Sequence, residues 1–182
     1  MPLEFTTSYL KDASDVFRYY KHLGERAMEQ TPDSGLFAAL DAESNSIAVI
    51  VKHVSGNLRS RWTDFLTTDG EKPTRNRDSE FENPASTRAE LRAQWEAGWK
   101  SLFDTLAQLT DEDLSRRVVI RTEAHSVTQA INRALAHTVY HVGQIVYLAK
   151  HFAGANWRAL TIPRGKSAEF AADVAARKLS QR

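Results

Sequence analysis

The sequence contains no cysteine. This absence excludes disulfide bonds, thiolate metal ligands and a cysteine nucleophile, so histidine and carboxylate side chains are the protein groups that remain for binding a metal ion. A chain without cysteine needs no oxidising compartment to fold, and we expect a cytoplasmic protein.

A long apolar run is also missing. Nowhere do about 18 uninterrupted apolar residues occur, which is the length that a membrane-spanning helix needs. Residues 1–15 lack a basic segment followed by an apolar stretch, the pattern of an export signal. We therefore expect neither a membrane span nor a cleaved leader.

The charge is balanced, with 24 Lys and Arg against 23 Asp and Glu, and a formal net charge of +1. Such a chain has no net field to attract nucleic acid or an anionic membrane, so nucleic acid is not an expected partner. The 42% hydrophobic and 26% charged residues are typical of a globular protein, and 182 residues fit one domain, which we expect to span residues 1–182.

Four stretches carry apolar residues at spacings of three and four, which places these residues on one side of a helix. The predicted helices cover residues 8–30, 44–66, 87–109 and 127–152, with a shorter helix at 167–178. Two of the four begin at capping boxes, formed by Thr87 with Glu90 and by Ser126 with Gln129. In the last helix Phe170 and Val174 are positioned to dock on the rest of the protein.

The predicted fold class is all-α, with the four long helices packed as a bundle around a common axis. Residues 116–121, RRVVIR, are rich in β-branched side chains, but no partner strand is evident and we do not predict a sheet. Residues 67–85 are polar and contain a glycine and two prolines, which predicts a long connection with little regular structure. Connections of that length inside a compact domain are often functional.

Two histidines, His137 and His141, stand four positions apart in the apolar helix 127–152. Residues at this spacing lie one above the other, so both rings can reach one metal ion, and periodicity places them beside the apolar stripe. His53 is the best third ligand, and Gly56 in the next turn would let another segment approach closely. Periodicity leaves open whether His53 points inward or outward.

The spacing alone also fits ordinary histidines at the edge of a core, without a metal. His22, His125 and His151 are expected at the surface. Asn57 and Gln144 are candidates to orient the ligands, or are polar residues at a stripe edge. In the 67–85 connection, Lys72, Arg75 and Arg77 either meet an anionic substrate or form a salt-bridged, solvated lid or dimer contact. The spacing of Trp62, Trp95 and Trp99 fits packing in the core.

Three segments, residues 60–81, 130–150 and 162–170, resemble the DUF1572 group of the DinB/YfiT superfamily of four-helix bundles. The resemblance implies an up-down-down-up bundle with a long crossover between the second and third helices. It also implies a divalent metal ion, zinc or nickel, bound by His53, His137 and His141. Proteins of this superfamily often form homodimers. We expect the same of this chain, because its last long helix has apolar residues away from the main stripe, at Val139, Val146 and Tyr147.

Relatives in that superfamily include zinc-dependent transferases of low-molecular-weight thiols and a thiol-dependent maleylpyruvate isomerase. A bound cation lowers the pKa of water to about 7 or holds a thiol as thiolate, so the expected protein is a hydrolase or an S-transferase acting on a small molecule. Because the chain lacks cysteine, such a thiol would come from outside it. The alternative is a non-enzymatic bundle or dimer with a structural metal or none. DNA binding is disfavoured by the balanced charge.

Overall fold

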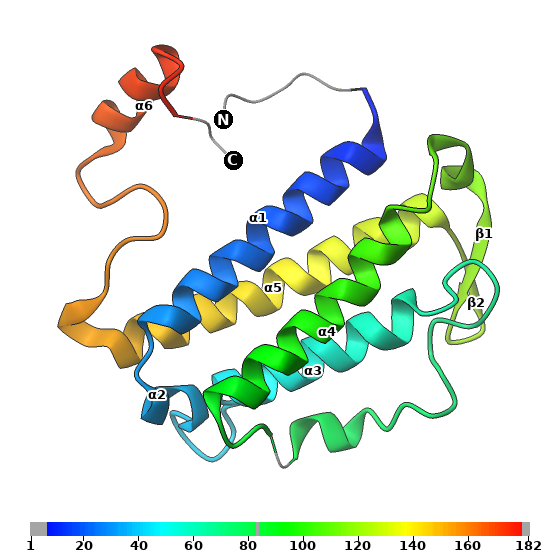
Figure 1. Ribbon diagram of the computed structural model, residues 1–182, viewed down its shortest axis with the longest axis horizontal. Helices are drawn as coiled ribbons and strands as arrows, with labels where there is room; N and C mark the ends of the chain where they lie inside the picture. The colour runs from blue at the N-terminus through cyan, green and yellow to red at the C-terminus, as the bar shows by residue number, and fades with distance from the viewer. Residues whose placement is uncertain (1–6, 83, 180–182) are drawn as a thin grey trace.

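The computed structural model describes residues 7–82 and 84–179. The chain is mostly helical, as the sequence predicts, and its four long helices lie side by side around one hydrophobic core (Figure 1). They are α1 (Tyr9–Gln30), α3 (Ile47–Trp62), α4 (Arg88–Leu106) and α5 (Val127–Ala153). The shorter elements are the helices α2 (Asp33–Phe37) and α6 (Ser167–Ala175) and the 3-10 helices η1 (Asp78–Phe81), η2 (Asp111–Ser115) and η3 (Gly154–Asn156).

Helix ends follow local hydrogen bonding. Both predicted capping boxes are present, at Thr87 with Glu90 and at Ser126 with Gln129, so α4 and α5 begin where the sequence places them. Helix α3 ends at Trp62, four residues before the predicted end at 66, because Thr63 has an extended backbone, with φ −74° and ψ 129°; its N–H makes the last helical hydrogen bond, to the carbonyl of residue 59. Helix α4 likewise ends at 106 instead of 109.

The core forms where α3 packs on α4 and α1 packs on α5. Trp95 and Trp99 are almost fully buried, and Trp62 is 2% exposed, which confirms their predicted role in packing. Gly98 brings α4 close to α3, since a Cβ atom at this position would lie 2.7 Å from the Cα of Ser55. This close contact fixes the position of α3, which carries one of the candidate ligands.

The prediction that residues 116–121 form no strand is wrong. β1 (Arg117–Ile120) pairs antiparallel with β2 (Glu123–Ser126), the segment that follows directly along the chain. Arg121 and Thr122 connect the strands with φ values of 54° and 67°, the left-handed conformation that tight hairpin turns require. Asp69 accepts hydrogen bonds from both backbone N–H groups of this turn, at 2.8 and 2.7 Å.

The connection between α3 and α4, residues 67–85, runs along α3 and has more regular structure than predicted (Figure 1). At one end it pairs with the hairpin, since the Gly70 N–H donates to the Val119 carbonyl at 2.8 Å. Further on it forms η1, which Lys52 attaches to α3 by donating to the carbonyls of Ser79 and Glu82, both at 2.6 Å. The connection therefore covers one side of α3 at a fixed position.

Helix α6 lies away from the four long helices (Figure 1). None of its side chains is buried, and Phe170 and Val174 are only partly covered, so the predicted docking of this helix is not found. In the described part of the chain, every helix is too short or too polar to cross a membrane.

Candidate metal centre

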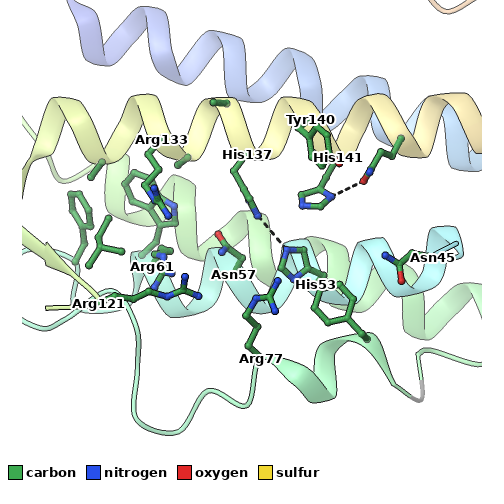
Figure 2. A pocket seen from close by; sticks show the side chains of 18 residues that line it. Asn45, His53, Asn57, Arg61, Arg77, Arg121, Arg133, His137, Tyr140 and His141 are labelled. Carbon is green, nitrogen blue, oxygen red and sulfur yellow. Dashed lines mark hydrogen bonds between the residues drawn. The ribbon is translucent and has the colours of Figure 1, made fainter. Parts of the chain in front are cut away.

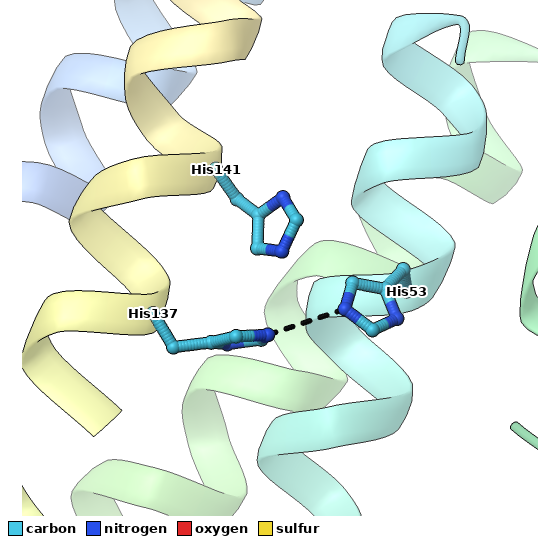
Figure 3. Close-up of side chains that lie close together, drawn as sticks. All are labelled: His53, His137 and His141. Carbon is cyan, nitrogen blue, oxygen red and sulfur yellow. Dashed lines mark hydrogen bonds between the residues drawn. The ribbon is translucent and has the colours of Figure 1, made fainter. Parts of the chain in front are cut away.

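Three histidines from two helices converge between α3 and α5 (Figure 3). His53 comes from α3, and His137 and His141 come from α5. One ring nitrogen of each lies within 4.8 Å of the other two, and the Nε2 atoms of His53 and His137 are 3.2 Å apart. The structure thus brings together all three residues that the sequence analysis singled out.

The two histidines of α5 have the geometry that their spacing predicts. Their ring centroids are 4.6 Å apart, and both side chains are partly buried at the edge of the core. The ring of His53 lies opposite them, with centroid distances of 5.2 Å to His137 and 4.8 Å to His141.

The sequence left the direction of His53 open, and the structure turns it inward with 4% exposure. The 67–85 connection explains this burial. Phe81 of η1 stacks on the imidazole ring, with centroids 4.8 Å apart and planes inclined by 30°. Residues from a distant part of the sequence therefore convert a polar position on α3 into a buried one.

Glu80 orients His53. The Nδ1–H of His53 donates to the Oε2 atom of Glu80 at 2.9 Å, which leaves the Nε2 lone pair directed toward the other two rings. Burial would raise the pKa of the Glu80 carboxyl, but the hydrogen bond from His53 and the pairing with Arg75 outweigh it and lower the pKa. Glu80 is therefore a carboxylate at neutral pH and accepts the proton of His53.

Arg75 holds Glu80 in place through two hydrogen bonds, from Nε to Oε1 at 2.7 Å and from Nη2 to Oε2 at 2.9 Å. The Arg75 side chain is 5% exposed, so this two-point ion pair is well shielded from water. Gly56 makes the arrangement possible, since a Cβ atom there would overlap the Glu80 carboxylate. The expected role of Gly56 in allowing close approach of another segment is confirmed.

Gln144 orients His141 in the same way, because its Oε1 atom lies 2.8 Å from Nδ1 and accepts the ring proton. The Nε2 atom of His141 is then free to bind a metal. Asn57, the other candidate for orienting a ligand, lines the adjoining cavity, and no hydrogen bond joins it to a histidine among the described residues.

The electrostatics keep the rings of α5 neutral. Burial, together with the smaller effects of the charges of His141 and His53, lowers the pKa of His137 from 6.5 to about 3. Burial also lowers the pKa of His141, against the opposing effect of its hydrogen bond to Gln144. Metal ligation requires deprotonated imidazole, so these rings do not have to lose a proton at neutral pH before they bind an ion.

The donor set fits a divalent transition metal. Imidazole nitrogen suits zinc, copper, iron and nickel, and zinc–nitrogen bonds of about 2.0–2.1 Å place two tetrahedral ligand atoms about 3.3–3.4 Å apart. The separation of 3.2 Å between the Nε2 atoms of His53 and His137 is close to this value. Two of the three rings also have the hydrogen-bonded Nδ1 atom that is typical of metal-binding histidines.

A cavity of about 610 Å³ adjoins the three histidines (Figure 2). Small-molecule sites have volumes of about 300–1,000 Å³. Of Lys72, Arg75 and Arg77, for which the sequence left open substrate contact or a salt-bridged lid or dimer contact, Arg77 alone lines this cavity. Arg75 is buried against Glu80, and the amine of Lys72 donates to Thr68 and to the carbonyl of Asp69 at 2.6 and 2.7 Å.

The remaining histidines lie outside the centre. His22 and His151 are exposed, as predicted, and His125 is partly buried in β2. Sequence reasoning missed Glu80 as the residue that orients His53. The glycine one turn after His53 was the available signal, because it indicates that another segment approaches there.

Comparison with curated proteins gave no match. The family model described as "Protein of unknown function (DUF1572)" matches residues 4–166. This match includes the four long helices, the 67–85 connection and all three histidines of the centre. The chain therefore belongs to the DUF1572 family.

Proposed function

We propose that this protein binds one divalent metal ion, zinc or nickel, through His53, His137 and His141, and uses it in a transferase or hydrolase reaction on a small molecule. The observation that carries the proposal is the convergence of three ring nitrogens within 4.8 Å of one another beside a cavity. The orientation of His53 by a buried carboxylate adds to it.

A divalent ion at this position supplies Lewis-acid chemistry and makes a water molecule or a thiol more acidic. The protein contributes the fixed positions of the ligands. Glu80 holds the proton of His53 on Nδ1, and Gln144 does the same for His141, so that both Nε2 atoms remain available to the ion. Phe81 covers His53 and keeps water from its buried side.

A catalytic role is favoured over a structural one by the number of ligands and by the cavity. Structural zinc sites are closed by four protein ligands, whereas catalytic sites have three and keep a position for water or substrate. The histidine cluster provides three ligands among the described residues. Since the chain contains no cysteine, a thiol in the reaction would be a low-molecular-weight molecule from outside.

Kinetics test this proposal. Protein purified without an affinity tag is dialysed against chelator, reloaded with zinc or nickel, and assayed for thiol transfer to electrophiles and for ester hydrolysis, with the His137→Ala variant as the control. Activity that depends on both the metal and His137 supports the proposal. Equal inactivity of wild type and variant, together with a large fall in melting temperature on adding chelator, would identify a structural metal instead.

We also propose that the fold is the up-down-down-up bundle of the DinB/YfiT superfamily, with residues 67–85 as the long crossover. Figure 1 supports this order, since α1 and α5 start at the end of the molecule near the hairpin, and α3 and α4 start at the opposite end. A crystal structure compared with members of that superfamily tests the assignment.

Homodimer formation through the outer face of α5 completes the proposal. Tyr140 and Tyr147 lie two turns apart on this helix and are 63% and 72% exposed, with the exposed Gly143 between them. Large exposed aromatic side chains at one face are typical of association surfaces. Light scattering of the wild type and of Tyr147→Glu tests this, and we expect a dimer and a monomer, respectively.

A further inference from the structure

The cavity beside the histidines is lined by positive charge. Four arginines contribute to its wall, and no Asp or Glu does among the described residues; the arginines are Arg61, Arg77, Arg121 and Arg133. They come from four separate parts of the fold, in order α3, the 67–85 connection, the hairpin turn and α5. Figure 2 shows their side chains directed into the same space as His137 and Asn57.

Two of these arginines, Arg61 and Arg121, share the carboxylate of Glu71. Arg61 and Arg121 donate to its Oε2 atom at 2.8 and 2.9 Å. Burial would raise the pKa of the Glu71 carboxyl, but the hydrogen bonds from Arg61 and Arg121 and the charge of Arg75 lower it, so this carboxylate is ionised at neutral pH. The cluster of Arg61, Arg121 and Glu71 therefore serves mainly to attach the hairpin to α3.

The other two arginines lack such a partner. Arg133 is exposed and forms no ion pair with any carboxylate in the described part of the chain. Arg77 lies over the ring of Phe81, with its guanidinium carbon 5.0 Å from the centroid, and its nearest carboxylate is that of the almost fully exposed Asp78, at 3.9 Å. A contact of that length between exposed groups contributes little, so both guanidinium groups can bind an anion.

The rest of the wall is apolar or carries neutral polar groups. Trp62 and Phe65 stack with ring centroids 4.7 Å apart, and these two rings and Ile120 reach the cavity with only a small area, since they are 2%, 6% and 6% exposed. Asn57 and Tyr140 add hydrogen-bonding groups near the histidines. A pocket with an apolar side and a few convergent polar groups is typical of sites for small organic molecules.

We infer that the substrate of this centre is a small organic anion, whose carboxylate or phosphate is bound by Arg77 and Arg133 while the rest of the molecule lies in the cavity beside Asn57 and His137. This inference rests on the proposed function for the reaction at the metal, but the anion site itself is built from residues other than the three histidines. Guanidinium groups bind the oxygen atoms of both kinds of anion through paired hydrogen bonds.

Isothermal titration calorimetry tests the inference with benzoate and phenyl phosphate as probes and benzamide as the neutral probe of matched shape. The titrations use the full chain, without metal and with one equivalent of zinc. We expect one or both anions to bind more tightly than benzamide, and the comparison between them distinguishes a carboxylate site from a phosphate site. Increasing salt should weaken this binding, since the charges are partly exposed.

Arg133→Gln and Arg77→Gln should each weaken anion binding about tenfold, because each removes a charge-assisted hydrogen bond. Arg92→Gln, an exposed arginine on α4 that does not line the cavity, is the matched control and should bind like the wild type. Circular dichroism checks that each variant is folded. Binding of benzamide as tight as that of the anions, or no effect of either cavity variant, would overturn the inference.

Zinc content, measured by elemental analysis on the same samples, separates the two proposals. If the protein binds zinc but neither anion, the metal centre is supported and the anion site is refuted. If it binds anions through Arg77 and Arg133 but no zinc, the anion site is supported and the metal centre is refuted.

Discussion

The pairing of Glu80 with His53 and Arg75 gives the sharpest prediction, tested by Glu80→Gln. The substitution keeps the shape of the side chain and removes its charge. Arg75, which is 5% exposed, then loses its nearest carboxylate and keeps only the contacts to Glu71 at 3.3 and 3.4 Å. Breaking a buried ion pair costs about 3–5 kcal/mol, and the remaining contact to Glu71 reduces this to about 2–3 kcal/mol.

For a chain of 182 residues, this loss corresponds to a fall in melting temperature of about 5–10 °C. Zinc affinity should fall about 10- to 100-fold, because His53 loses the charged acceptor that fixes its ring and raises its basicity. Thermal melting of the metal-free protein and competition with a chromophoric chelator measure the two effects. Glu82→Gln, at an exposed carboxylate of the same connection, is the control. An unchanged zinc affinity in Glu80→Gln would refute the orienting role of Glu80.

Three further predictions follow from local geometry. Between pH 6.5 and about 3 the unfolded chain binds a proton at His137 that the folded chain does not. Lowering the pH from 7.5 to 5 should therefore destabilise the metal-free protein by about 1–2 kcal/mol. Denaturant titrations measure this loss, and the His137→Gln variant should lack that part of the pH dependence. Gly56→Ala should displace the Glu80 carboxylate and weaken zinc binding, as chelator competition would show; equal affinity would contradict the close approach. Thr122→Gly should stabilise the protein by about 0.4–1 kcal/mol in chemical denaturation, since a β-branched residue has a φ of 67° there, and a loss of stability would argue against strain in this turn.

The long helices could be predicted because each has an apolar stripe of its own and, for α4 and α5, a capping box at its start. The hairpin could not. Its turn, Arg121–Thr122, has none of the glycine or asparagine residues that favour positive φ, and β2, with the sequence EAHS, has little strand propensity. Hydrogen bonds from this turn to Asp69, about fifty residues earlier in the sequence, help to hold it in place.

The candidate metal centre could also be predicted only in part. The pairing of His137 with His141 follows from helical spacing, which is a local property. The burial of His53 depends on Phe81 and Glu80, which reach α3 through the connection between two helices, and helical periodicity contains no information about that path. Gly56 signalled that some segment approaches α3, and only the structure identifies that segment.

The most direct test of the central claim is the metal content of the untagged protein after dialysis against chelator and reloading with zinc. Elemental analysis should give one zinc ion per wild-type chain and a loss of this stoichiometric binding in His53→Ala, His137→Ala and His141→Ala. His151→Ala, at an exposed histidine outside the centre, should retain it. Zinc bound equally by all four variants, or by none of the proteins including the wild type, would contradict a three-histidine metal centre.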